Sequence, residues 1–256
     1  MNKSSFGSHF TVTTWGESHG KALGAVVDGC PAGLSLSEDD IQIFLDRRKP
    51  GQSRYTTARK EGDLVEILSG VFEGKTTGTP ISLMVRNTDQ RSRDYGNIAY
   101  SYRPGHADYT FDQKYGFRDY RGGGRSSGRE TIGRVAAGAI ASKILEELGI
   151  SICTYTRSIG PVEIASFNKE EIHQNAFYMP DAQAAVKAGE YLEECMKNQD
   201  SAGGVIECRI NGVPAGIGDP VFVKLDAAFA QALMSIGAVK AVEVGDGVKV
   251  SSMKGS

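Results

Sequence analysis

The chain has 256 residues, with 40% apolar and 23% charged side chains and a formal net charge of −2 at pH 7. These values are typical of a soluble globular protein that is long enough to bury a full hydrophobic core. No apolar run approaches the roughly 20 residues of a membrane span, and the N-terminus has no apolar signal segment. We therefore expect a cytoplasmic protein without a membrane partner.

The cysteines are far apart in the sequence and form no CxxC pair. This spacing argues against a disulfide framework and a zinc site, and no histidine has metal-ligand spacing, so we expect no bound metal. We expect the cysteines to be small buried residues of a reduced protein: Cys30, Cys153, Cys195 and Cys208.

Strands and helices are both expected along the chain. Short apolar or alternating segments between turn residues predict strands at 10–15, 23–27, 64–68, 81–85, 152–156, 162–165, 205–210 and 239–244. Apolar residues at helical spacing predict helices at 38–48, 132–148 and 181–197, and a further helix that Asp226 caps and that ends just before Gly237. This mixture favours an α+β fold in one domain over residues 1–256, with helices packed on antiparallel sheets.

Two of these helices carry further signals. Ser37 is a suitable N-cap for the first, and Pro50 ends it because proline disfavours helical backbone at the residue before it. The second contains Gly133 and Gly138, each of which weakens a helix by about 1 kcal/mol relative to alanine. We expect a packed neighbour or a ligand to need that space. Residues 87–129 are expected to be mostly loop, and loops of this length are usually functional or disordered.

Arginine is unevenly distributed along the chain. Of the 15 arginines, 13 fall between Arg47 and Arg134, and this window has a local charge of +7 while the remainder has −9. Arginine can hold phosphate or carboxylate with two parallel hydrogen bonds. A nearly neutral protein that gathers its arginines beside glycine-rich turns is expected to bind a small, multiply charged anion.

The strongest motif is the segment RGGGRSSGRET at 121–131, which runs into the helix expected at 132–148. Unpaired N–H groups at a helix N-terminus attract anions, the glycines allow close approach, and the arginines add charge. The segment is neither a Walker A loop nor a GxGxxG turn after a strand. The alternative is a flexible surface loop with solvated arginines.

Three shorter motifs also carry candidate functional residues. The segment RRKPGQSR at 47–54 follows a helix end, where cations suit the helix dipole even without a ligand. His106 lies between a turn and an acidic residue and could titrate near neutrality, and His19 is flanked by small residues at a strand end. For His106, the alternative is a loop histidine that is bonded to the backbone. Ser18 and Ser126 lie in no GxSxG turn, which argues against a hydrolase nucleophile.

Together these segments resemble the signature segments of chorismate synthase, in the order and spacing of that family. The matching segments are 13–20, 47–53, 76–81, 103–108, 121–129, 200–204 and 242–247. The resemblance covers essentially the whole chain and is highly specific. It implies a β-α-β sandwich of helices and antiparallel sheets, assembled as a homotetramer. It also implies a carbon–oxygen lyase of the shikimate pathway, which eliminates phosphate from 5-enolpyruvylshikimate 3-phosphate in a 1,4-anti reaction and forms chorismate.

The resemblance further implies roles for individual residues. His19 would donate a proton near the departing phosphate, and His106 would protonate reduced FMN, which the reaction requires without net redox change. Ser18, Arg48 and Arg129 match substrate-binding positions.

Other matching positions belong to nucleotide cofactors. Arg48 and Arg54 correspond to positions associated with NADP, which would serve if the protein reduces its own flavin with NADPH. The family commonly has asparagine where Gly237 stands, which is a departure from its pattern. The positions that match flavin-contacting segments are Arg125, Ser126, Ser127, Gly237 and Ala238.

The resemblance implies that family sequences continue beyond Ser256 with further flavin-binding and catalytic segments. We expect this chain to be a C-terminally incomplete part of such a sequence, weakly active or inactive alone.

Two other functions compete with this interpretation. A nucleic-acid-binding module is one, because loops rich in arginine and tyrosine also bind single strands. The acidic remainder of the chain argues against it, so we expect no nucleic-acid partner. A non-catalytic relative is the other, and the presence of both His19 and His106 argues against it.

Overall fold

The computed structural model describes residues 4–55, 61–88 and 99–255. The chain forms two compact units, the first from residues 1–45, 63–139 and 213–256 and the second from residues 46–62 and 140–212. We describe each unit by itself, and the single domain over residues 1–256 stays a prediction. Part of the predicted 87–129 loop lies outside the described residues, as do three arginines of the arginine-rich window: Arg59, Arg91 and Arg93.

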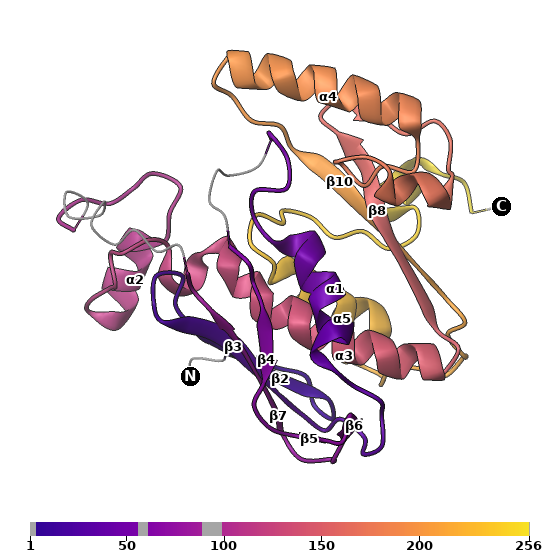
Figure 1. Cartoon of the computed structure of the whole chain (residues 1–256). Coiled ribbons are helices and arrows are strands. Elements are labelled where there is room, and N and C mark those ends of the chain that lie inside the picture. The colour runs from indigo at the N-terminus through magenta and orange to yellow at the C-terminus, as the bar shows by residue number, and fades with distance from the viewer. Residues whose placement is uncertain (1–3, 56–60, 89–98, 256) are drawn as a thin grey trace. The chain divides into compact units, whose positions relative to one another are not determined.

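A five-stranded antiparallel sheet with the order β1-β2-β3-β7-β4 forms the base of the first unit (Figure 1). Its strands are β1 (Ser5–Phe6), β2 (Thr11–Gly16), β3 (Ala22–Asp28), β4 (Val65–Ile67) and β7 (Ile81–Arg86). The short strands β5 (Val71–Phe72) and β6 (Lys75–Thr76) form a separate hairpin. The strands predicted at 10–15, 23–27, 64–68 and 81–85 are thereby confirmed within two residues at each end.

Alternation along β3 and β7 builds the core of this unit, because successive side chains of a strand point to opposite faces. Every second residue of these strands is buried: Leu23, Ala25, Val27, Ile81, Leu83 and Val85. Helix α1 (Glu38–Arg48) adds the buried side chains of Ile41 and Leu45. At its start, the backbone N and Oγ of Ser37 donate to Asp40 Oδ2 over 2.8 and 2.9 Å, which ties the first turn of the helix to the residue before it.

Helix α3 (Thr131–Glu147) begins in the first unit against β2 and β3. A Cβ on Gly133 would lie 2.8 Å from the oxygen of Gly24 and 2.9 Å from Thr14 Cγ2, so the prediction that a neighbour needs this space is confirmed there. At Gly138 the described residues provide no such neighbour, and the ligand alternative stays a prediction there. That residue is exposed, and none of the described atoms outside its own helix lies within 4 Å of its virtual Cβ.

The second unit has a three-stranded antiparallel sheet with the order β10-β8-β9. Its strands are β8 (Ser151–Ile159), β9 (Val162–Glu163) and β10 (Gly204–Asn211). Helix α4 (Ala182–Lys197) contributes Ala184, Ala185 and Ala188 to a cluster with the buried Met179. Asp181 caps this helix by accepting hydrogen bonds from Gln183 N and Ala184 N. The helix predicted at 181–197 and the strand at 205–210 are confirmed.

Several details differ from the sequence-based expectations. The expected strand at 239–244 is absent from the structure of these residues, because no neighbouring strand pairs with it and Val239 N instead closes a turn on Ile236 O. Helix α5 (Leu225–Met234) follows Lys224 and ends at Ser235, so Asp226 lies in its first turn and is not its cap.

Helix α2 (Asp108–Tyr115) lies within residues 87–129, which are otherwise mostly loop where the structure describes them. One further expectation needs correction. All four cysteines are free, but only Cys30 of the four is buried. Cys153 and Cys195 are half-buried, and Cys208 is exposed because it lies on a strand whose residues are mostly solvent-facing. Within the described ranges, no helix combines the length and apolar character needed to cross a membrane. The α+β class with antiparallel sheets is confirmed.

Candidate active site

His19 lies in the turn that joins β2 to β3. The backbone N of Gly20 donates to Glu17 O over 3.0 Å, which closes a four-residue turn with Ser18 and His19 at its centre. Ser18 is completely buried, and its Oγ lies 3.0 Å from His19 Nδ1. The hydroxyl of Ser18 therefore orients the imidazole of His19, the proton donor that the family resemblance implies.

Gly122 closes over this imidazole. A Cβ on Gly122 would lie 2.1 Å from His19 Nδ1 and 3.0 Å from Ser18 Oγ, and the residue has a φ of +71°, which favours glycine. Its carbonyl accepts a hydrogen bond from Arg103 Nη2 over 2.7 Å. The segments that the sequence marked at 13–20, 103–108 and 121–129 therefore meet around His19.

Arg103 is held rigidly by Asp108. Its Nε and Nη2 donate to the two carboxylate oxygens over 2.9 and 2.8 Å, and its backbone N donates over 3.0 Å. These bonds hold the pKa of Asp108 at about 2. His106, in the turn between them, is exposed, with its Nδ1 3.1 Å from Pro104 O and its backbone N donating to Arg103 O.

Two carboxylates lie near the same turn. Burial raises the pKa of Glu17, while Arg125 opposes the shift and Asp119 adds to it. A Cβ on Gly124 would lie 3.0 Å from Glu17 Oε2. The glycine-rich segment 121–129, called the glycine loop below, therefore lies directly against this carboxylate. Asp119 accepts two hydrogen bonds from the guanidinium of Arg121, which lower its pKa, with a smaller contribution from the charge of His19. The site therefore contains both cationic groups that donate hydrogen bonds and carboxylates that accept them.

Arg125 fastens the glycine loop to the sheet. It donates to Gly16 O over 3.2 Å, and to Thr14 O and Oγ1 over 3.1 and 2.6 Å. The loop itself forms two 3-10 turns, η2 (Gly124–Ser126) and η3 (Gly128–Glu130), so it reaches α3 through these turns and not directly. Ser126 is exposed, whereas Ser127 Oγ accepts from Arg129 N and caps η3.

A polar chain connects this loop to the end of α5. Thr14 Oγ1 donates to Glu130 Oε1 over 2.8 Å, and Glu130 Oε2 accepts from Arg134 Nε over 2.8 Å. Arg134 Nη1 and Nη2 then donate to Ser235 Oγ and O over 2.7 and 3.2 Å. Gly237 and Ala238 follow two and three residues later, so both predicted flavin-contacting segments lie on one connected part of the first unit.

Arg129 is placed differently from the other arginines of the loop. Its side chain is only 6% exposed, and its guanidinium donates to Asn87 Oδ1 over 3.1 and 2.8 Å. Its Nη1 lies 3.0 Å from Asp63 Oδ1, whose side chain is fully buried. In this structure the Arg129 guanidinium is directed into the protein. Its role in substrate binding stays a prediction.

Arg48 and Arg54 belong to the second unit. Arg48 is the half-buried last residue of α1, whose end is capped by Gln52 Nε2 donating to the carbonyl oxygens of Asp46 and Arg47 over 2.7 Å each. Arg54 forms an ion pair with Glu193 of α4. Its guanidinium also donates to Tyr55 Oη over 2.8 Å. Their roles in substrate and NADP binding stay predictions.

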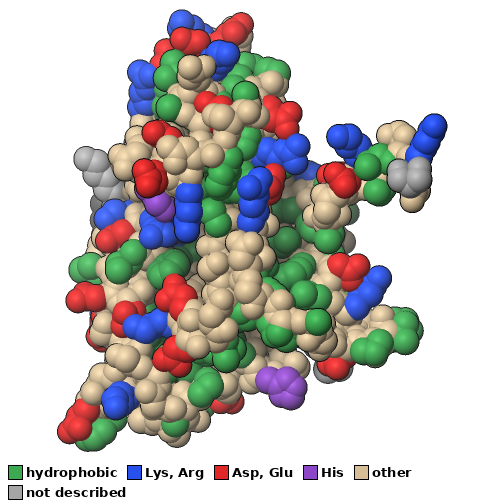
Figure 2. Space-filling view, turned by 90° about the vertical axis from the view of Figure 1, so that its right-hand side faces the viewer, with side chains coloured by type: hydrophobic (Ala, Val, Ile, Leu, Met, Phe, Trp, Pro, Cys, Tyr) green, Lys and Arg blue, Asp and Glu red, His purple; other side chains and the backbone are tan. Residues whose placement is uncertain are grey.

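Many other arginines also pair with acidic residues. On the face drawn in Figure 2, Lys and Arg side chains lie among Asp and Glu side chains. Within the described ranges, no group of three or more His, Cys, Asp and Glu side chains is arranged to hold a metal ion.

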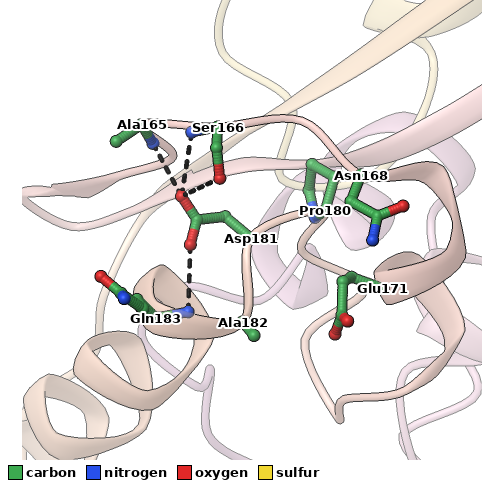
Figure 3. Close-up of a pocket in the computed structure, with 8 residues that line it drawn as sticks. All are labelled: Ala165, Ser166, Asn168, Glu171, Pro180, Asp181, Ala182 and Gln183. Carbon is green, nitrogen blue, oxygen red and sulfur yellow. Dashed lines mark hydrogen bonds between the residues drawn. The ribbon is translucent and has the colours of Figure 1, made fainter.

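The second unit contains a hollow of about 410 Å³ beside the start of α4 (Figure 3). Asp181 points into the surrounding loop, where its Oδ2 accepts from Ala165 N, Ser166 N and Ser166 Oγ over 3.0–3.1 Å. Its Oδ1 accepts from the helix, so both oxygens serve the fold. None of the site residues predicted from the sequence lines this hollow.

Sequence reasoning missed the residues that support the site. Asn87 had a usable signal, because a polar residue directly after a buried strand lies at the edge of a sheet. The others are ordinary acidic residues without a distinctive pattern: Asp63, Asp119 and Glu130.

The fold and the site define an α+β protein with an imidazole set among arginine-rich glycine loops. Comparison with known proteins is consistent with this description. A family model described as chorismate synthase matches residues 10–256. A solved structure titled "Crystal Structure of Chorismate Synthase" superposes with a TM-score of 0.80 at 34% identity, over 97% of this chain and 72% of that chain.

Curated relatives named chorismate synthase are similar over the whole chain. The protein of Agathobacter rectalis is 67% identical, that of Lachnoclostridium phytofermentans 66% and that of Lachnospira eligens 64%. In each case the match covers 100% of this chain and 70% of the relative. The chain belongs to the chorismate synthase family. This confirms the predicted fold and function, and with them the predicted class of enzyme, a lyase.

Proposed function

We propose that this chain supplies His19 as the general acid at the departing phosphate when phosphate is eliminated from 5-enolpyruvylshikimate 3-phosphate to give chorismate. The observation that carries the proposal is the enclosure of His19 by Ser18 and Gly122. An imidazole has a pKa that allows it to donate a proton near neutral pH, and a fixed ring delivers it in one direction. A leaving phosphate that accepts this proton leaves as a weaker base.

The substrate carries a phosphate and two carboxylates, so binding requires several cations. Arg48 is the proposed substrate-binding arginine of the second unit, and Ser18 is the proposed contact beside His19. The buried pairing of Arg129 with Asp63 favours an indirect contribution of Arg129 to substrate binding. Arginine suits phosphate and carboxylate because its planar fork matches their paired oxygens.

The residues of the first unit fit an anionic flat cofactor such as reduced FMN. Arg125 and the exposed Ser126 offer donors for a phosphate, and the virtual Cβ of Gly237 has no described atom within 4 Å. The residues that we propose to hold FMN are Arg125, Ser126, Ser127, Gly237 and Ala238. When bound, reduced FMN supplies transient electron density as phosphate leaves. His106 is proposed to hold a proton on the flavin side.

Three further properties belong to the proposal through the family. Arg48 and Arg54 are the proposed NADP contacts if the protein reduces its own flavin with NADPH. A homotetramer is the proposed assembly, and the cytoplasm is the proposed location. Each rests on the family assignment.

Phosphate release from 5-enolpyruvylshikimate 3-phosphate with reduced FMN, measured without oxygen on the full-length protein, tests the proposal. His19→Ala and His106→Ala should each remove most of the activity. A positioned proton donor contributes about 10²–10⁴-fold to a rate. His9→Ala is the matched control, since His9 is exposed and lies outside the site. Wild-type turnover in His19→Ala would refute the role of that residue.

A further inference from the structure

Asn87 stands directly after β7, at the edge of the sheet next to the His19 turn. Its backbone N donates to Lys21 O over 3.1 Å, which continues the β3–β7 ladder one step beyond the pair Ala22–Arg86. The ladder fixes the backbone of Asn87, so its side chain starts from a defined position.

The amide nitrogen of Asn87 spans the whole turn. Nδ2 donates to Glu17 O over 3.1 Å and to Gly20 O over 2.8 Å. These carbonyls belong to the first and last residues of the turn whose central residues are Ser18 and His19. One side-chain amide therefore fixes both ends of the segment that carries the proposed general acid.

The amide oxygen of Asn87 is held from the other side. Oδ1 accepts from Arg129 Nε and Nη2 over 3.1 and 2.8 Å, and the same guanidinium lies 3.0 Å from Asp63 Oδ1. The two N–H groups of the Arg129 guanidinium can donate only to the oxygen of the Asn87 amide, so the amide nitrogen must face the turn. All four hydrogen-bonding capacities of the amide are then used. Because Arg129 and Asp63 are buried, water competes weakly for these bonds.

We propose that Asn87 is a positioning residue that sets the geometry of the His19 turn, and that Asp63 and Arg129 hold it in place. The proposal rests on the role of His19 in the proposed function. It predicts that the N–H donors of the Asn87 amide matter more for the geometry of the His19 turn than the size of the side chain. Asn87→Asp keeps the size of the side chain and the acceptor for Arg129, but it turns a carboxylate oxygen toward two carbonyl oxygens.

The test combines proton–carbon NMR of the histidine rings with steady-state kinetics. His19→Ala identifies the His19 signals. In Asn87→Asp these signals should shift while those of His106 stay in place. The value of kcat should fall about 10²-fold, as expected when a catalytic group moves by about 1 Å. KM should change little, because the amide nitrogen of Asn87 is bonded to the backbone of the turn and its oxygen to Arg129.

Asn175→Asp is the matched control. Asn175 Nδ2 also spans two carbonyls, those of Glu171 and Met179, over 2.9 and 2.8 Å, and its Oδ1 accepts from Phe177 N and Met179 N. The substitution removes an equivalent backbone clamp in the second unit. It should leave kcat and the His19 signals unchanged.

The outcomes separate the alternatives. Unchanged His19 signals in a folded Asn87→Asp protein overturn the proposal, as do equal shifts in the Asn87→Asp and Asn175→Asp proteins. Shifted His19 signals in Asn87→Asp alone support it. If His19→Ala keeps wild-type turnover, the proposed function fails, while the NMR comparison still decides whether Asn87 sets the turn.

Discussion

Gly122→Ala tests most directly whether the glycine loop encloses His19. The new Cβ would lie 2.1 Å from His19 Nδ1 and 2.3 Å from Cε1, far inside an ordinary contact of 3.4 Å or more. The carbonyl of Gly122 is tied to Arg103, so the loop cannot easily retreat. The imidazole must therefore move.

The size of the effect follows from these distances. Restoring an ordinary contact of 3.4 Å from 2.1 Å requires the ring to move by about 1.3 Å. A displacement of about 1 Å can cost roughly 10²-fold in rate, equal to about 2.7 kcal/mol of transition-state stabilisation. Alanine at a φ of +71° also costs roughly 1–2 kcal/mol of folding stability, whatever its neighbours are.

Gly74→Ala is the control for this second cost. Gly74 has a φ of +73°, and none of the described atoms lies within 4 Å of its virtual Cβ. Both variants should lose similar stability from the backbone in urea unfolding. Only Gly122→Ala should lower kcat by about 10²-fold and shift the His19 ring signals. Equal kcat values and unshifted His19 signals in the two variants would show that Gly122 does not pack on His19.

Three further predictions concern the supports of the site and of the second unit. Asp108→Asn should destabilise the protein at pH 7. Because Arg103 holds the pKa of Asp108 at about 2, below its ordinary 3.8, the pair stabilises the fold above about pH 4 and loses this effect as the pH falls through 2. The urea midpoints of wild type and variant should therefore converge near pH 2, and a constant difference would contradict this. Asp181→Ala should cost about 1 kcal/mol or more through the lost N-cap, measured by thermal unfolding, with unchanged kcat. Arg134→Ala should weaken FMN binding in a fluorescence titration, because its bonds to Ser235 hold the segment before Gly237, and unchanged affinity would exclude that link.

Local patterns were sufficient to predict most elements and the family. Ser37 marked a helix start, and the alternation of β3 and β7 marked buried strands, because capping and period-2 burial depend on neighbouring residues. The segments around His19, His106 and Arg125 were recognisable for the same reason, since each motif is continuous in the chain. The expected strand at 239–244 failed because a strand needs a partner, which local sequence does not specify.

The sequence by itself determined which side chains were available: a histidine in a short turn, arginines beside glycines, and the order of the family's motifs. Only the tertiary structure decided which of them meet. It turned Arg129 inward to Asn87 and Asp63, set Gly122 on His19, and joined the glycine loop to α5 through Glu130 and Arg134. Apart from the local pair of Glu130 and Arg134, these contacts join residues from about 40 to about 100 positions apart, so packing and buried charge chose them, and no local pattern could.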